Sequence, residues 1–273
     1  MSVVKLCTKV GMTRANYYKR KHQSKEREIN EGLVISLVNR ERRDHPRIGG
    51  RKLYKMLKPE LEEAGVQIGR DRLFQILREH GLLVQRLPKA PRTTDSRHCL
   101  PVCRNLIREL EPTSPNQIWV SDITYVRLES SFVYLSLITD LHSRKIVGHY
   151  CSDSLESLGC VEALDRALAD LPADRYPIHH SDRGCQYCCH EYIDRLIARG
   201  LPVSMTEDNH CYENATAERV NGILKQEYGL HMTFRNIEQA RRAIAQAVCM
   251  YNNRRPHMSL QYRTPAEVHA EVA

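Results

Sequence analysis

The spacing of apolar residues divides the chain into a helical part and a part with strands. Before residue 86, Ile29, Leu33 and Leu37 recur at helical intervals until Pro46 ends the pattern. Two more helices are predicted within GRKLYKMLKPELEEAG (residues 50–65) and VQIGRDRLFQILREHGLL (residues 66–83), the second after a strand-like entry and a turn at Gly69. This part is therefore predicted to be all-helical.

From residue 117 the pattern changes to strands and then alternates. QIWVSDITYVRL, SFVYLSLITDL and KIVGHYCS are three β-rich runs separated by short turns, which predicts an antiparallel meander. Helical patterns over residues 157–171, 188–200 and from about Asn214 onward then alternate with the short strands PIHHSD and PVSMT. This order predicts a mixed α/β sheet covered by helices.

Charge follows the same division. The formal net charge is +8, yet residues 1–110 hold 25 Lys and Arg against 12 Asp and Glu, whereas residues 111–273 hold 16 against 21. A basic first part is suited to a polyanion such as DNA. We predict a short helical or helix-turn-helix segment at residues 1–25, a helix-turn-helix DNA-binding module at 26–85, a basic Pro-rich linker at 86–116 and an α/β core with a C-terminal helix and tail at 117–273.

The third predicted helix carries the arginines best placed for DNA. Arg70, Arg72 and Arg78 lie on or beside it, within reach of phosphates or base edges. A solvated basic helical bundle is the alternative for this module. For residues 1–20 the alternatives are a small helix-turn-helix, with a turn at Gly11 and Thr13 as an N-cap, and a basic helix hairpin.

Composition bounds the class of protein. The chain of 273 residues has ten scattered cysteines, and its first residues lack the apolar stretch of a secretory signal. With no run long enough to cross a bilayer, we expect a soluble cytoplasmic protein with reduced thiols and no membrane partner. Cys185 and Cys188 have metal-ligand spacing, but no second pair lies at a zinc-ribbon distance, so buried or incidental thiols are the favoured interpretation.

The stretch NHCYENATAERVNGILKQE (residues 209–227) has a polar face that packing alone does not explain. As a helix beginning near Asn214, it places Asn214, Glu218, Asn221 and Lys225 in one stripe. The neighbouring apolar stripe holds Ala217, Val220 and Leu224. A helix that packs on a core thus aims a carboxylate, two amides and an ammonium in one direction.

Three carboxylates stand where strand ends and a covering helix can bring them together: Asp122 inside an apolar strand, Asp182 at the end of PIHHSD, and Glu218 on its helix. Converging carboxylates repel one another unless cations neutralise them, and an all-oxygen set selects Mg²⁺ or Mn²⁺. Two such ions, roughly 3.5–4 Å apart, support in-line attack at phosphorus. We expect Lys225 to hold a substrate phosphate, and Asn214 and Asn221 to position metal-bound water or the backbone.

Other polar residues near the strands have competing interpretations. Asp140 also ends a strand, where it caps a turn or pairs with Arg144 in preference to a catalytic role. His179 and His180 could shuttle protons or bind metal, but packing is the favoured interpretation. Trp119 is expected in the core.

Two groups of arginines are candidates for DNA contact. Arg183 follows Asp182 in a turn, with Gln186 and Tyr187 available to contact DNA beside it. Arg254 and Arg255 lie in the C-terminal YNNRRPHMSLQYRTPAEV, for which docking against the core is favoured over a phosphate-contacting tail.

Several motifs then point to a known family. Asp122, Asp182 and Glu218 are separated by 59 and 35 residues, which resembles the DD(35)E pattern of transposases and retroviral integrases. The chain also resembles, over nearly its whole length, the second-frame transposases of bacterial insertion sequence family 3. The matching stretches are HPRIGGRKLYKML, GRDRLFQILREHGLL, IWVSDITYV, LITDLHSRKIVG, HHSDRGCQY, CYENATAERVNGILKQE and YNNRRPHMSLQYRTPAEV.

The resemblance implies an RNase H-like core, a mixed five-stranded sheet flanked by helices, that cleaves DNA at element ends and uses the freed 3′-OH to attack another phosphodiester. It places Asp122, Asp182 and Glu218 at the catalytic, metal-binding positions. It also implies terminal inverted repeats and target DNA as partners, a homo-oligomer on DNA at the bacterial nucleoid, and a possible fusion to a first-frame product. Departures from the usual family residues fall at Ile48-Gly49-Gly50-Arg51, Cys185 and Glu213.

Two rival functions use the same residues differently. A transposase-derived DNA-binding protein without turnover would have no use for the three acids. A ribonuclease H or resolvase-type nuclease would share the metal site, but it needs neither the basic first 110 residues nor the polar face from Asn214 to Lys225.

Overall fold

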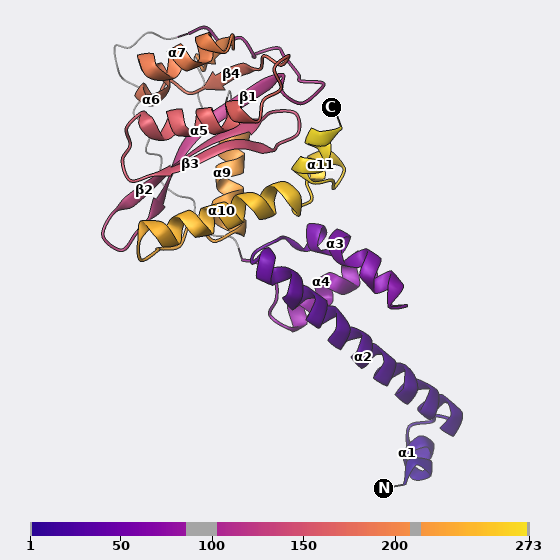
Figure 1. The fold of residues 1–273 in the computed structure, drawn as a ribbon. Helices are drawn as coiled ribbons and strands as arrows, with labels where there is room; N and C mark the ends of the chain where they lie inside the picture. Colours follow the sequence, from indigo (N-terminus) through magenta and orange to yellow (C-terminus); the bar gives the residue numbers. More distant parts are fainter. Residues whose placement is uncertain (1, 86–102, 208–213, 272–273) are drawn as a thin grey trace. The chain divides into compact units, whose positions relative to one another are not determined.

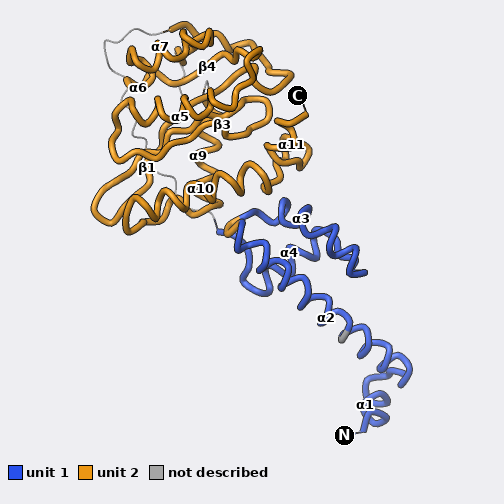
Figure 2. Tube along the Cα trace, in the orientation of Figure 1, with its two compact units in different colours: residues 1–44, 48–85 blue, residues 45–47, 86–273 orange. Residues whose placement is uncertain are grey.

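The computed structural model describes residues 2–85, 103–207 and 214–271. The chain divides into two compact units, residues 1–44 with 48–85 and residues 45–47 with 86–273 (Figure 2). Residue 213, one of the departures from the family pattern, lies outside the described residues. Among the described residues, no helix combines the length and the apolar character needed to span a membrane.

The first unit is all-helical, as predicted. It contains α1 (Val3–Lys9), α2 (Arg14–Asp44), α3 (Gly50–Glu63) and α4 (Arg70–Glu79), and α2, α3 and α4 share one apolar core that includes the fully buried Ile48. The turn at Gly11 forms, and Thr13 Oγ1 accepts a hydrogen bond from Asn16 N at 3.2 Å, which confirms the predicted cap.

The helix α2 differs from the sequence prediction. Residues 14–44 form one continuous helix, so the residue-25 boundary falls inside a helix and the two helical patterns on either side of it belong together. Residues 20–28, RKHQSKERE, lack apolar periodicity but consist mostly of good helix formers, which explains why the pattern did not reveal the continuity. The strand-like entry before α4 is not a strand.

The second unit contains the predicted mixed sheet of five strands (Figure 1). The strands are β1 (Ile118–Arg127), β2 (Phe132–Asp140), β3 (Ile146–Ser152), β4 (Ile178–Ser181) and β5 (Val203–Met205), in the order β3-β2-β1-β4-β5. β1, β2 and β3 pair antiparallel, whereas β1 with β4 and β4 with β5 pair parallel. The predicted antiparallel meander is therefore confirmed.

Helices cover both faces of this sheet. On one face lies α5 (Leu158–Ala169), which packs with α7 (His190–Ala198) around Trp119 and Ile138. On the other face lie α9 (Ala215–Glu227) and α10 (Ile237–Asn253), around Val126 and Leu135. The remaining short helices are α6 (Cys185–Cys188), η1 (Met258–Leu260) and α11 (Pro265–Ala270). Because Trp119 and Val126 of β1 belong to different layers, β1 alternates its side chains between the two apolar layers.

The contact between α5 and β3 depends on Gly148. A Cβ atom at this position would lie 2.2 Å from the backbone oxygen of Ala163, so no larger residue fits without moving the helix away. The outer edge of β3 is capped at its first residue, because Asn252 of α10 exchanges two hydrogen bonds of 2.9 Å with the backbone of Ile146. Capping an edge strand in this way removes unpaired backbone groups.

Candidate active site

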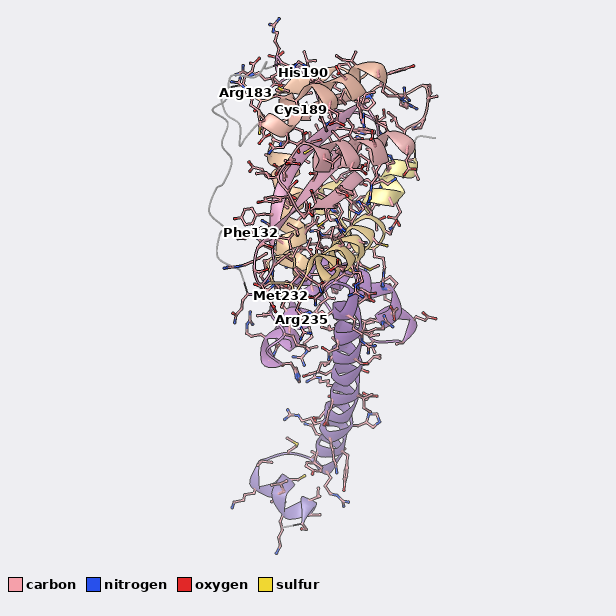
Figure 3. All side chains as sticks on the ribbon, turned by 60° about the vertical axis from the view of Figure 1, so that its left-hand side comes forward. Phe132, Arg183, Cys189, His190, Met232 and Arg235 are labelled. Carbon is pink, nitrogen blue, oxygen red and sulfur yellow. The ribbon has the colours of Figure 1, made fainter. Side chains whose placement is uncertain are left out.

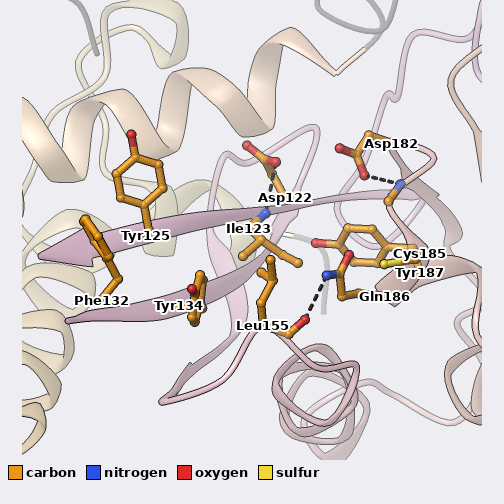
Figure 4. Close-up of a pocket in the computed structure, with 11 residues that line it drawn as sticks. Asp122, Ile123, Tyr125, Phe132, Tyr134, Leu155, Asp182, Cys185, Gln186 and Tyr187 are labelled. Carbon is orange, nitrogen blue, oxygen red and sulfur yellow. Dashed lines mark hydrogen bonds between the residues drawn. The ribbon is translucent and has the colours of Figure 1, made fainter. Parts of the chain in front are cut away.

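Two of the three candidate acids lie where parallel strands separate. β1 and β4 pair only from Ile118↔Ile178 to Val120↔His180, after which β4 ends at Ser181 and β1 continues alongside β2. Asp122 and Asp182 each lie two residues beyond the last pair. Because parallel strands run in register, this equal offset places both carboxylates at the same level, in the crevice beyond the strand ends (Figure 4).

Asp122 is held by neighbours on two elements. Asn221 Nδ2 of α9 donates to Asp122 Oδ2 at 2.8 Å, and the backbone N of Ile123 donates to Oδ1 at 3.0 Å. Burial, with the negative charges of Asp182 and Glu218, raises the pKa of Asp122 to about 7 against the opposing effect of the Asn221 hydrogen bond. Asp122 therefore interacts electrostatically with both other acids, and their combined negative charge favours its protonated form.

Asp182 shapes its own turn. Its Oδ1 accepts a hydrogen bond from the backbone N of Gly184 at 2.9 Å, and a Cβ at position 184 would lie only 3.0 Å from the same oxygen. Glycine thus allows the close approach. Arg183 Nε donates to the carbonyl oxygen of Thr206 at 2.6 Å, which ties the turn to the end of β5.

The polar face of α9 is explained by its contacts with β1. Asn214 Nδ2 donates to the backbone oxygen of Ser121 at 2.9 Å, and Asn221 binds Asp122, so the two amides anchor the helix on the strand. The Oδ1 atoms of both amides are buried, and neither has a hydrogen-bond partner among the described residues. Glu218, between them on the helix, is exposed.

The carboxylates suit a hard cation by their chemistry. Among residues 2–85, 103–207 and 214–271, no three His, Cys, Asp or Glu side chains are close enough together to coordinate one ion. Asp122, Asp182 and Glu218 nevertheless offer only oxygen ligands, which favour Mg²⁺ or Mn²⁺ over zinc, and the raised pKa of Asp122 shows that added positive charge would stabilise its carboxylate.

Comparison with known proteins agrees with this geometry. Models of the integrase core domain match residues 112–211 and 199–265. The chain is 34% identical to the insertion element IS600 uncharacterized 31 kDa protein of Shigella sonnei, over 96% of each chain. It is 30% identical to the transposase for insertion sequence element IS629 of Shigella sonnei, over 96% of this chain and 89% of the relative.

The chain belongs to the IS3 family of transposases. Its fold is also similar to a chain of the simian T-cell lymphotropic virus intasome solved by cryo-EM in complex with PP2A regulatory subunit B56 gamma. That match has a TM-score of 0.51 and 20% identity, and it covers 82% of this chain and 75% of the other. This likeness shows the integrase-type, RNase H-like fold, so the predicted fold class is confirmed.

In this IS3-family chain, Lys225 lies near the acids but is already engaged. Its Nζ stands 4.3 Å from the centre of the Tyr125 ring. Burial lowers the pKa of Lys225, and the charge of Asp122 opposes that effect. The ammonium group thus sits at the border between the carboxylates and an aromatic surface.

The arginines proposed for DNA contact have different surroundings in the transposase. Arg70, Arg78 and Arg254 are exposed, and Arg72 donates to Glu31 at 2.7 Å. Arg255 is only 3% exposed because it forms two hydrogen bonds, of 2.8 and 2.9 Å, with Glu227 of α9. Arg255 thus docks the C-terminal segment against α9, as the favoured interpretation predicted, and a DNA contact by Arg255 stays a prediction.

Several other predictions are settled by burial. Tyr187 is 2% exposed but lines a pocket together with Asp122 and Asp182, so its contact with DNA stays a prediction, while Trp119 lies in the core as predicted. His179 and His180 are fully buried and bind Ser121 and Ser204, which confirms packing. Cys188 is buried against Met205, and Cys185 is exposed.

Asp140 caps a turn, as predicted. It accepts hydrogen bonds from Asn116 N, Ser143 N and Ser143 Oγ at 2.6–2.7 Å. The guanidinium of Arg144 donates instead to Thr216 of α9, so the alternative of an ion pair with Asp140 is wrong. Sequence reasoning also missed an aromatic pocket beside the acids, although strict alternation along β1 and β2 places its rings on one face.

Proposed function

We propose that this protein is a metal-dependent DNA transposase that cleaves DNA at the ends of its insertion sequence and joins the freed 3′-OH to a target phosphodiester. The observation that carries the proposal is the equal offset of Asp122 and Asp182 beyond Val120↔His180, with α9 anchored beside them. Membership of a transposase family supports it.

Asp122, Asp182 and Glu218 would hold two Mg²⁺ or Mn²⁺ ions. When bound, such ions activate the attacking oxygen and stabilise the leaving oxygen of a phosphodiester. The chain itself supplies orientation: Asn221 fixes one oxygen of Asp122, the Gly184 amide fixes one oxygen of Asp182, and Asn214 fixes α9 on β1. Preorganised ligands bind ions without first having to be ordered.

DNA contacts would come from both units. Lys225 would bind a phosphate next to the acids, and Arg183 and Arg254 would contact the backbone nearby. In the first unit, a helix-turn-helix module over residues 26–85, with Arg70, Arg72 and Arg78, would read the terminal inverted repeats. We further propose a homo-oligomer on DNA in the bacterial cytoplasm, with a first-frame product as a possible fusion partner.

The test uses the purified full chain with Mn²⁺ and an end-labelled duplex carrying the terminal sequences that flank its gene. Strand-transfer products support the proposed transposase, whereas hydrolysis without joining indicates a nuclease. Retention of the duplex without cleavage indicates a DNA-binding protein without turnover. The three rival functions therefore predict three different products on the same gel.

A further inference from the structure

Among the described residues, no helix covers part of one sheet face next to the acids. Tyr125 of β1 lies directly opposite Tyr134 of β2, and Arg127 lies opposite Phe132. Opposite residues in an antiparallel pair share a face, and here it is the face that α5 covers farther along, around Trp119 and Ile138. Beyond α5 the rings meet solvent, so that Phe132 remains 43% exposed.

These rings and the acids line one pocket of about 460 Å³ (Figure 4). Asp122 and Asp182 lie on one side of it, and Tyr125, Tyr134 and Phe132 lie on the side away from Asp182. The floor and wall between them are formed by Ile123, Leu155, Gly184, Cys185, Gln186 and Tyr187. Gln186 Nε2 donates to the backbone oxygen of Leu155 at 2.8 Å and so closes one side of the pocket.

The lining favours a flat, uncharged group. Of the described side chains that line the pocket, only the two aspartates are charged, so in the absence of bound cations an anionic group would be repelled from their side of it. Lys225 and Arg127 do not line the pocket, but their cationic groups lie 4.3 and 6.0 Å from the ring centres of Tyr125 and Phe132. The edge-to-face contact of Tyr125 with Phe132, 5.5 Å between ring centres, presents aromatic surface rather than polar atoms. A volume of this size is typical of sites that bind small organic groups.

We propose that this pocket binds an unstacked nucleobase of the DNA strand whose phosphodiester is cut at Asp122 and Asp182. This inference rests on the proposed function, because a phosphate at the acids places the adjoining nucleotide at the pocket mouth. Enzymes that hold a base outside the helix stack it on aromatic side chains. Stacking of this kind tolerates any base, so the pocket itself would not have to read the sequence.

Phe132 is the best residue to change. It begins β2 at the surface, so Phe132→Ala removes a ring without opening the core, whereas Phe132→Trp keeps an aromatic face. Met232→Ala is a matched control, because Met232 is 60% exposed and does not line the pocket (Figure 3). Tyr134→Phe and Tyr134→Leu separate aromatic stacking from simple apolar contact at a second position.

The test is a double-mutant cycle between protein and DNA. A single abasic nucleotide is moved through the three positions on each side of the cleaved bond, and cleavage is measured with the full-chain variants. We expect Phe132→Ala to slow cleavage of intact DNA about tenfold and to have no effect when the abasic nucleotide is the one that fills the pocket. We expect Phe132→Trp and Met232→Ala to cleave intact DNA at about the wild-type rate.

Two results would overturn the base pocket. One is that Phe132→Ala slows cleavage equally at every abasic position, and the other is that it does not slow cleavage of intact DNA. If the wild-type protein cuts no duplex in Mn²⁺, the proposed function fails separately. The pocket is then judged by fluorescence anisotropy with the same intact and abasic DNAs. Coupling between Phe132 and one nucleotide supports the pocket, and its absence overturns it.

Discussion

Asn221 of α9 donates a hydrogen bond to the carboxylate of Asp122 in β1, which joins a helix to a strand residue 99 positions earlier in the chain. The amide fixes the orientation of one carboxylate oxygen and leaves the other to the backbone of Ile123. A residue that hydrogen-bonds to a metal ligand affects how tightly that ligand binds the ion, although it does not touch the ion itself.

We therefore expect Asn221→Ala to raise the Mg²⁺ concentration that gives half-maximal cleavage by about 10- to 100-fold. A metal titration of the cleavage rate measures the effect. Asn253→Ala is the control, because Asn253 is an exposed amide whose side chain, among the described residues, bonds within α10. An unchanged metal requirement in the Asn221 variant would contradict the orienting role.

Removing the charge of any one candidate acid should abolish chemistry without preventing DNA binding. We expect Asp122→Asn, Asp182→Asn and Glu218→Gln each to reduce the cleavage rate by at least about 100-fold. Losses of this size are typical when an enzyme loses one group that stabilises its transition state. Gel shifts with the end duplex check binding. A variant that cuts at the wild-type rate would exclude its residue from the site.

Asp140 provides the opposite case, an acid whose role is structural. Burial raises the pKa of Asp140, but the nearby His269 ring, 3.9 Å away, and hydrogen bonds from Ser143 and Asn116 outweigh burial and hold the pKa below its ordinary value. The folded state therefore stabilises the ionised form of Asp140 more than the unfolded state does. Its stabilisation is present above the unfolded pKa and is lost as pH falls through the folded pKa.

We expect Asp140→Asn to lower the free energy of unfolding by about 1–3 kcal/mol at pH 7, because charged hydrogen bonds to buried donors are lost. Thermal unfolding at several pH values measures the loss, which should shrink in acid as the wild-type carboxylate protonates. Cleavage at a temperature where the variant is folded should persist. If the folded variant no longer cleaves DNA, the purely structural role of Asp140 is wrong and Asp140 becomes a candidate catalytic acid.

Lys225 is expected to act through its charge on the DNA backbone. Lys225→Gln should weaken binding of the cleaved end and reduce the slope of log affinity against log salt by about one. Binding at several salt concentrations measures the slope. Tyr125→Leu is a useful comparison, since it removes the ring under the ammonium but leaves the charge. An unchanged slope in the Lys225 variant would exclude a phosphate contact.

The sequence by itself predicted most of the elements, the fold class and the family of this protein. Periodicity predicted the meander, the alternating helices and the amphipathic helix that carries Glu218, because these depend on residues close together in the chain. The same local signal identified Asp122 as an acid in an apolar strand. The spacing of the three acids pointed to the family that the comparisons then showed.

Only the tertiary structure decided which distant residues meet. The strand order places β1 between β2 and β4, and the early end of β4 opens the crevice at Asp122 and Asp182. The tertiary structure also pairs Arg255 with Glu227 and leaves the Phe132 ring partly exposed, away from α5. Local periodicity reports which face of an element is apolar, but the partner of that face depends on how the whole chain packs.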